Sequence, residues 1–145
     1  MIVSQILKSK AMGGVLTLPS TASVSDAAAI MSDKKIGTIV ISDDDGTTAN
    51  GILSERDIVR EIGKSGPSCL TASVGEMMTS KLVCCGPSDV PLTVLAKMTE
   101  GRFRHMPVIE DGKMIGLISI GDAVKARLAQ LAMERDALEG MVMGH

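Results

Sequence analysis

Aromatic residues are almost missing from this sequence, which has one Phe and no Trp or Tyr among its 145 residues. A planar ligand therefore has almost no aromatic ring to stack on, and would be held by aliphatic side chains, backbone groups or arginine. Proteins that bind single-stranded nucleic acids commonly stack the bases on aromatic side chains. We do not expect that mode of binding here.

The sequence also lacks a strong excess of charge of either sign. It has 15 basic and 17 acidic residues, and its formal net charge is -2. Binding to a phosphate backbone requires a clustered basic surface. The charge balance therefore argues against nucleic acid as the main partner.

Long apolar runs, secretion signals and cysteine pairs are missing too. No apolar run approaches the length that crosses a bilayer, and the N-terminal MIVSQILKSK has no basic region followed by an apolar stretch. Three cysteines, an odd number without a CxxC pair, are typical of a reducing compartment and offer no metal or disulfide framework. We expect a cytoplasmic protein with no membrane partner and no metal.

An internal repeat is the main feature that is present. Residues 19–41 (PSTASVSDAAAIMSDKKIGTIVI) correspond to residues 87–109 (PSDVPLTVLAKMTEGRFRHMPVI) at an offset of 68. Residues 51–59 (GILSERDIV) correspond to residues 116–124 (GLISIGDAV) at an offset of 65, because the intervening turn is shorter in the second copy. A third similarity, between VSQIL at 3–7 and VGEMM at 74–78, lies upstream of both. Such self-similarity indicates two copies of one structural unit.

Each copy has the pattern of a small α/β (α+β) unit, in the order short helix, strand, helix, strand, strand, helix. Apolar residues at helical spacing predict the first long helix of each copy. The apolar content of 45% is sufficient for a folded core. We expect one unit at 1–66 with an N-terminal helix and one at 67–145 with an extended C-terminal helix, packed by pseudo-twofold symmetry with clefts between them. The predicted parts are strands 38–41 and 106–109, their hairpin partners 52–53 and 115–118, helices 55–62 and 122–139, and a linker at 63–68.

The duplicated opening VGEMMT, the pattern Gly-x-x-Ser-x-x-Asp and the strand RHMPV resemble a cystathionine-β-synthase (CBS) domain pair, also called a Bateman module. The resemblance runs from residue 3 to about residue 128 and is closest to small stand-alone bacterial CBS pairs. It implies tandem CBS repeats that bind AMP, ADP, ATP, S-adenosylmethionine or NAD(H) in clefts between the repeats. It also implies a homodimer that reports nucleotide state to a separate, unidentified protein.

The resemblance also implies ligand-binding residues. Asp57 and Asp122 match the ribose-binding position, and Ser54 and Ser119 match the hydroxyl beside ribose and phosphate. The remaining matches are strand residues beside adenine and residues before the first long helix: Ile36, Gly37, Thr38, Arg104, His105, Met106, Pro107, Thr17, Leu18, Cys84 and Cys85. The first copy has Ile39 where the second has Pro107, so the two sites are expected to differ.

The chemistry of these residues agrees with that role. One carboxylate can accept hydrogen bonds from both hydroxyls of a ribose, and a helix N-terminus offers free N–H groups to a phosphate. Arg56, Arg102 and Arg104 could pair with phosphate oxygens. Gly51 and Gly116, three residues before the serines, could let a ligand approach closely.

Structural explanations compete with these functional ones. Ser-x-x-Asp before an apolar run is also a helix capping box, and a single such motif is better explained by capping than by a binding site. His105, the methionines and Cys84–Cys85 are each consistent with packing alone. The apolar stripe of the C-terminal helix can meet a second subunit or fold back onto its own core, and we favour the dimer.

The sequence therefore predicts a regulatory adenosine-nucleotide-binding module for energy or redox sensing. AMP, ADP or ATP is the expected ligand, with NAD(H) as a variant. An interaction scaffold without ligand is the alternative. An enzyme is less favoured, because no nucleophile–base pair, metal cluster or P-loop is present.

Overall fold

The computed structural model describes residues 1–10 and 14–144. The first repeat contains α1 (Val3–Ser9), β1 (Thr17–Leu18), α2 (Val24–Lys34), β2 (Thr38–Ile41), β3 (Gly51–Ser54) and α3 (Glu55–Ser65). A 3₁₀ helix (Pro67–Thr71) follows, and then the second repeat contains α4 (Val74–Met77), α5 (Pro91–Gly101), β4 (His105–Glu110), β5 (Lys113–Ser119) and α6 (Ile120–Val142). The predicted mixed α/β fold is therefore confirmed.

Besides small shifts at the ends of several helices and strands, the structure differs from the prediction at the linker and at one strand. The expected linker at 63–68 is largely helical, because α3 continues to Ser65 before Gly66, which has a positive φ of 78°, ends it. In the second repeat, the strand that precedes α5 is reduced to one parallel bridge between Cys85 and Val108. The first difference concerns the end of a helix, where assignments vary by one or two residues, and the second concerns a strand that is too short to form a ladder.

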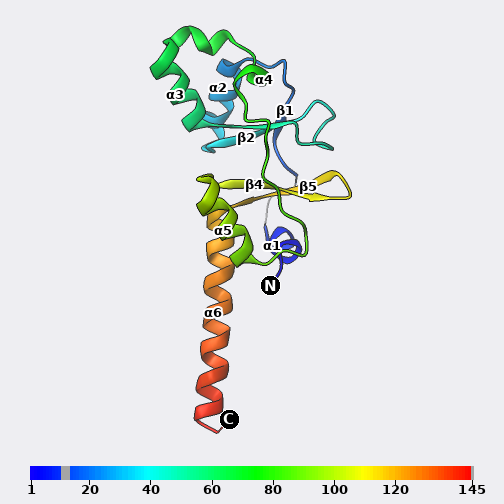
Figure 1. The fold of residues 1–145 in the computed structure, drawn as a ribbon, viewed down its shortest axis with the longest axis vertical. Coiled ribbons are helices and arrows are strands. Elements are labelled where there is room, and N and C mark those ends of the chain that lie inside the picture. Colours follow the sequence, from blue (N-terminus) through cyan, green and yellow to red (C-terminus); the bar gives the residue numbers. More distant parts are fainter. Residues whose placement is uncertain (11–13, 145) are drawn as a thin grey trace.

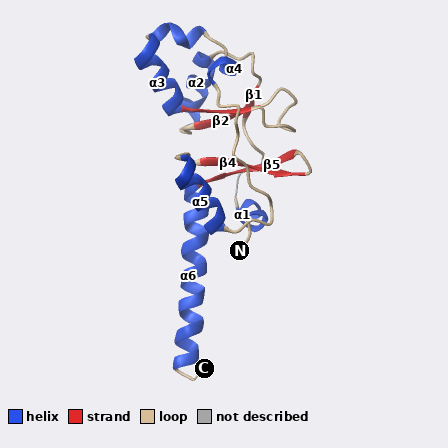
Figure 2. Cartoon of the chain, in the orientation of Figure 1, coloured by secondary structure: helices blue, strands red, loops and turns tan. Residues whose placement is uncertain are grey.

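Two small sheets lie next to each other in the middle of the molecule, with helices on their outer sides (Figure 1 and Figure 2). In the first sheet, β2 pairs in parallel with β1 and antiparallel with β3. In the second, β4 and β5 form an antiparallel hairpin with a register shift between Val108 and Ile109. The facing edges of the sheets bring residues of both repeats together.

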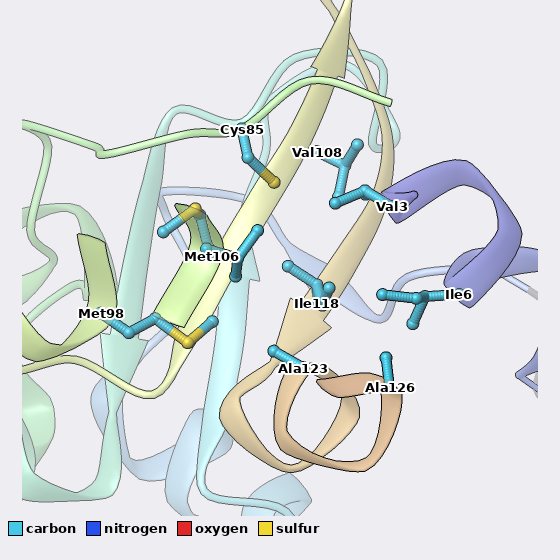
Figure 3. Close-up of a cluster of buried hydrophobic side chains, with 10 residues drawn as sticks. Val3, Ile6, Cys85, Met98, Met106, Val108, Ile118, Ala123 and Ala126 are labelled. Carbon is cyan, nitrogen blue, oxygen red and sulfur yellow. The ribbon is translucent and has the colours of Figure 1, made fainter. Parts of the chain in front are cut away.

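Each repeat encloses its own hydrophobic core, but each core contains a helix from the other half of the chain. The second-repeat core includes Val3 and Ile6 of α1, which lie beside β4, β5 and α6 (Figure 3). The first-repeat core includes Val74 of α4. The leading helices are therefore exchanged between the repeats.

Backbone hydrogen bonds hold the exchanged helices in place. The N–H of Val3 donates to the carbonyl of Asp89 at 2.8 Å, ahead of α5. The N–H of Val74 donates to the carbonyl of Ala22 at 2.7 Å, ahead of α2. These bonds satisfy helix N-terminal amides that would otherwise lack partners.

Helix α6 projects well beyond the two sheets toward the C-terminus (Figure 1). Only Ala123 and Ala126, near its start, are buried. Its large apolar side chains remain exposed on the projecting part, including Leu128, Leu138 and Met141. Among the described residues, no helix is long and apolar enough to span a membrane.

Candidate functional site

A cleft of about 480 Å³ lies between the two repeats. Its lining comes from β2, β3 and the start of α3 in the first repeat, the segment after α4, and the end of α5 with the start of β4 in the second. The lining residues are Gly37, Thr38, Ile52, Ser54, Glu55, Arg56, Asp57, Arg60, Thr79, Lys81, Leu82, Val83, Gly101, Arg102, Phe103, Arg104 and His105.

Ser54 and Asp57 form a complete capping box at the start of α3. The Asp57 N–H donates to Ser54 Oγ at 3.2 Å, and the Ser54 N–H donates to Asp57 Oδ2 at 2.9 Å. The other carboxylate oxygen, Asp57 Oδ1, lies 3.6 Å from Nη1 of Arg60. Ser54 and Asp57 therefore cap the helix, and Asp57 Oδ1 can still accept a hydrogen bond from a ligand hydroxyl.

The backbone N–H groups in the first turn of α3 differ in their hydrogen bonding. The N–H of Glu55 donates to the carbonyl of Gly37 at 2.8 Å, and the N–H of Asp57 is used by the capping box. The N–H of Arg56 makes no backbone hydrogen bond to a described residue outside α3. A helix N-terminus with a free amide favours an anion.

The cleft is rich in positive charge although the whole chain is slightly acidic. Five of its lining residues carry a cationic side chain: Arg56, Arg60, Lys81, Arg102 and Arg104. Glu55 and Asp57 are the two acidic residues of the lining. Cations gathered in a cleft raise the local concentration of anionic ligands.

Thr38 and His105 join the two repeats at the cleft. Oγ1 of Thr38 lies 3.1 Å from Nδ1 of His105. Burial lowers the pKa of His105, and the positive charges of Lys10 and Arg104 lower it further, whereas Asp122 opposes them. The imidazole is therefore neutral at neutral pH and can take part in uncharged hydrogen bonds.

The single aromatic residue of the chain is part of this cleft. Phe103 lines the cleft and also packs against the second-repeat core. Gly101 makes room for it, since a Cβ at that position would lie 2.6 Å from Cδ1 of the Phe103 ring. The expectation that a planar ligand has almost no aromatic ring to stack on stays a prediction, and the one ring of the chain lines this cleft.

Seven of the predicted site residues meet in the cleft: Gly37, Thr38, Ser54, Arg56, Asp57, Arg104 and His105. Nine do not line it: Thr17, Leu18, Ile36, Cys84, Cys85, Met106, Pro107, Ser119 and Asp122. Thr17 and Leu18 form β1, whereas Cys85 and Met106 are buried in the second-repeat core (Figure 3). Burial raises the pKa of the Cys85 thiol to about 11, with Asp89 adding to the effect, and burial also raises that of Cys84. These properties favour packing over a redox role for the two cysteines.

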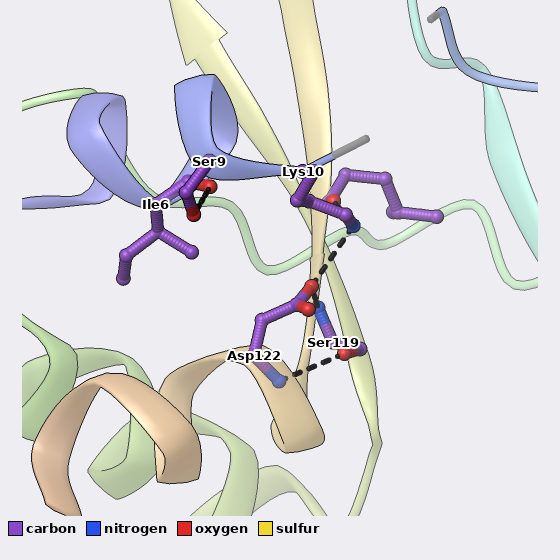
Figure 4. A network of polar contacts seen from close by, with 6 residues as sticks. Ile6, Ser9, Lys10, Ser119 and Asp122 are labelled. Carbon is purple, nitrogen blue, oxygen red and sulfur yellow. Dashed lines mark hydrogen bonds and ion pairs between the residues drawn. The ribbon is translucent and has the colours of Figure 1, made fainter. Parts of the chain in front are cut away.

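Ser119 and Asp122 form the equivalent capping box at the start of α6. The Ser119 N–H donates to Asp122 Oδ2 at 2.9 Å, as at Asp57. Here, however, Nζ of Lys10 also donates to Asp122 Oδ2 at 2.9 Å (Figure 4). The carboxylate at the second position is therefore already paired with a cation of the same chain.

Gly51 and Gly116, which were expected to let a ligand approach closely, are each covered by a side chain of the same chain. A Cβ on Gly116 would lie 2.8 Å from both methyl carbons of Leu7, and a Cβ on Gly51 would lie 2.7 Å from Cγ of Met78. The prediction of close ligand approach at Gly51 and Gly116 was therefore wrong. Small residues are required there because the leading helices pack closely over both strands.

Several cleft residues were missed from the sequence, notably Arg60, Lys81 and Phe103. Arg60 follows Arg56 by one helical turn, so the spacing could have placed it on the same face of α3. Lys81 could have been found by extending the similarity between residues 3–7 and 74–78, which aligns Lys81 with Lys10. Nothing in the local sequence distinguished Phe103 from a core residue.

Comparison with known proteins gives a consistent result. The CBS domain family model matches residues 3–64 and 74–129. The chain belongs to the CBS-domain family. The mitochondrial CBS domain-containing protein CBSX3 of Arabidopsis thaliana is 34% identical over 148 residues, which cover 98% of this chain and 72% of the relative. Another Arabidopsis relative, CBSCBSPB1, is 28% identical, and the match covers only 22% of its length.

Solved CBS-domain structures share the fold. A CBS-domain containing protein from Agrobacterium tumefaciens has a TM-score of 0.81 and 39% identity, covering 88% of this chain and 99% of that protein. A protein with CBS domains from Burkholderia ambifaria has a TM-score of 0.81 and 40% identity, covering 89% and 95%. Two more distant CBS structures contain adenosine compounds. One, from Pyrobaculum aerophilum, is a complex with AMP; it has a TM-score of 0.71 and 23% identity, and the match covers 84% of this chain and 89% of that protein. The other, protein MJ0100, is a complex with 5-methylthioadenosine and S-adenosyl-L-methionine; it has a TM-score of 0.74 and 21% identity, and the match covers 90% of this chain and 98% of that protein.

Proposed function

We propose that this CBS pair is a regulatory module that binds an adenosine nucleotide in the cleft that contains Asp57. The observation that carries the proposal is the convergence of five cationic side chains, a helix N-terminus and the Asp57 carboxylate on a single 480 Å³ cleft between the repeats. A volume in this range accommodates a small organic ligand. The adenosine compounds in the two distant CBS structures support the same ligand class.

The lining divides into regions that match the parts of a nucleotide. The phosphate would be held by the arginines and by the N–H of Arg56 at the start of α3. Asp57 Oδ1 would accept hydrogen bonds from the ribose hydroxyls. The base would lie against the apolar and aromatic side chains of the cleft, which are Ile52, Leu82, Val83 and Phe103.

The excess of positive charge favours AMP, ADP or ATP over a ligand without net negative charge. NAD(H) is a variant of the same proposal, since its pyrophosphate and adenosine would use the same contacts. We further propose that the chain forms a homodimer through the exposed apolar face of α6, and acts from the cytoplasm on a separate protein. Neither catalysis, a metal ion, nucleic acid nor a membrane has a part in this proposal.

A scaffold without ligand is the second candidate, and one observation favours it. Ser54 and Asp57 satisfy each other, and no buried side-chain nitrogen or oxygen among the described residues lacks a hydrogen-bond partner. Among the described residues, no buried side-chain polar group therefore needs a bound molecule to complete its hydrogen bonds. Under this alternative, the protein only connects subunits or partners.

Calorimetric titration of nucleotide-free protein with AMP, ADP, ATP, NAD⁺, NADH and S-adenosylmethionine tests the proposal. The decisive variant is Asp57→Asn, because asparagine keeps a side-chain oxygen for the Ser54 N–H while removing the charge. One lost charge-assisted hydrogen bond should weaken binding about 10-fold.

Asp122→Asn is the matched control, since it makes the same change in the other capping box and should leave binding at the Asp57 cleft intact. If no adenosine compound binds to folded protein, the scaffold is correct. Equal weakening by both variants would mean that Asp57 is not the ribose contact.

A further inference from the structure

The two repeats place a lysine at equivalent positions after their leading helices. Residues 3–7 and 74–78 correspond at an offset of 71, and the same offset relates Lys10 to Lys81. The structure supports this alignment, because Leu7 packs over Gly116, and its counterpart Met78 packs over the equivalent glycine, Gly51. Lys10 and Lys81 are therefore counterparts under the internal symmetry.

The two lysines make different contacts. Nζ of Lys10 donates to Asp122 Oδ2 and to the carbonyl oxygen of Leu117, each at 2.9 Å (Figure 4). Lys81 is exposed, lines the open cleft that contains Asp57, and forms no ion pair or side-chain hydrogen bond within the described part of the chain. One lysine is thus bound to the carboxylate of its site, and the other is not.

The contact of Lys10 changes what Asp122 can do. Asp122 Oδ2 already accepts the Ser119 N–H at 2.9 Å, so the ammonium of Lys10 is its second donor. Burial raises the pKa of Asp122, but the hydrogen bonds from Lys10 and Ser119 outweigh it and hold the pKa below its usual value. A ribose at Asp122 would compete with the ammonium of Lys10 at 2.9 Å, whereas the cation beside Asp57, the more exposed Arg60, lies 3.6 Å away.

We propose that Lys10 is a built-in competitor that closes the second nucleotide position, so that each chain binds one nucleotide, at Asp57. This inference rests on the proposed function, because it takes Asp57 and Asp122 as equivalent ribose positions. The N-terminal segment then determines the stoichiometry of binding.

The alternative role for Lys10 is that of a phosphate ligand. In that case, Lys10 would leave Asp122 when a nucleotide enters and would contribute to binding. The two roles predict opposite effects of removing the lysine. If Lys10 is a competitor, its removal strengthens nucleotide binding at the second position. If Lys10 contacts the phosphate, its removal weakens that binding.

Calorimetric titration with ADP of nucleotide-free full-length protein separates these outcomes. The wild type should bind one equivalent per chain, and Lys10→Ala should bind two, with the affinity at the second position raised at least about 10-fold by loss of the charged contact. Lys8→Ala is the matched control, because Lys8 is an exposed lysine of α1, two residues before Lys10, and should leave the stoichiometry at one. The double variant Lys10→Ala/Asp122→Asn should return to one.

Two equivalents in the wild type, or one equivalent in Lys10→Ala, would overturn the closure by Lys10. Weaker binding in Lys10→Ala would identify Lys10 as a phosphate ligand and also overturn it. Failure of the proposed function gives a different result, with no binding in the wild type or in any variant. Binding in Lys10→Ala alone would reject the Asp57 site while supporting the closure.

Discussion

Helix α1 should stabilise the second repeat rather than the first, and Ile6→Ala tests this. Ile6 is 4% exposed and belongs to the core formed by β4, β5, α5 and α6. The substitution removes three carbons from that core. At about 0.8 kcal/mol for each, the lost transfer free energy is about 2.4 kcal/mol, and the cavity adds to it. We expect the free energy of unfolding to fall by about 3 kcal/mol.

Denaturant unfolding measures the loss, and for a chain of this size it corresponds to a decrease in Tm on the order of 10 °C. Amide hydrogen exchange in β4 and β5 should also accelerate more than in β2 and β3. Lys8→Ala is the control on the same helix, because its side chain is exposed. The exchange of leading helices would be refuted if Ile6→Ala cost no more stability than Lys8→Ala, or if only β2 and β3 lost protection.

Two further predictions concern acid stability and assembly. Because burial lowers the pKa of His105, the unfolded chain binds a proton more readily than the folded chain below about pH 6.5, so the free energy of unfolding should fall as the pH drops from 7.5 to 5.5. In His105→Gln, the free energy of unfolding, measured by denaturant titration at each pH, should depend less on pH. The same pH dependence in the variant and the wild type would contradict this role of His105. Leu138→Glu should convert a dimer to a monomer in sedimentation because Leu138 is 62% exposed on the projecting part of α6. The neighbouring Ala137→Glu should not, and a wild-type monomer would contradict the proposed dimer.

The features that could be predicted from the sequence are those encoded locally. Both capping boxes join residues three positions apart, so Ser54 with Asp57 and Ser119 with Asp122 were visible as a pattern. The order of helices and strands follows from periodicity within each repeat. The family resemblance named Asp57 and Arg104 as ligand-binding residues, but only the structure shows that the two line the same cleft.

The features that could not be predicted depend on contacts between distant residues. Lys10 and Asp122 are separated by 112 positions, and no local rule relates them. The exchange of α1 and α4 is equally invisible to periodicity, because an apolar helix face does not specify which core it enters. The place of Phe103 was ambiguous for a similar reason. An apolar residue that packs against a core and one that lines a cleft have the same sequence pattern.

The exchanged leading helices make the two halves of the chain mutually dependent. A fragment that ends near residue 66 would carry α1, which belongs to the other core, and would lack Val74, which is fully buried in its own. The complementary fragment would be missing Val3 and Ile6. Each fragment alone is therefore incomplete, whereas the two mixed together possess every element and can complement each other. The same arrangement gives two intact chains a route to exchange N-terminal helices and form an intertwined pair without any new contact.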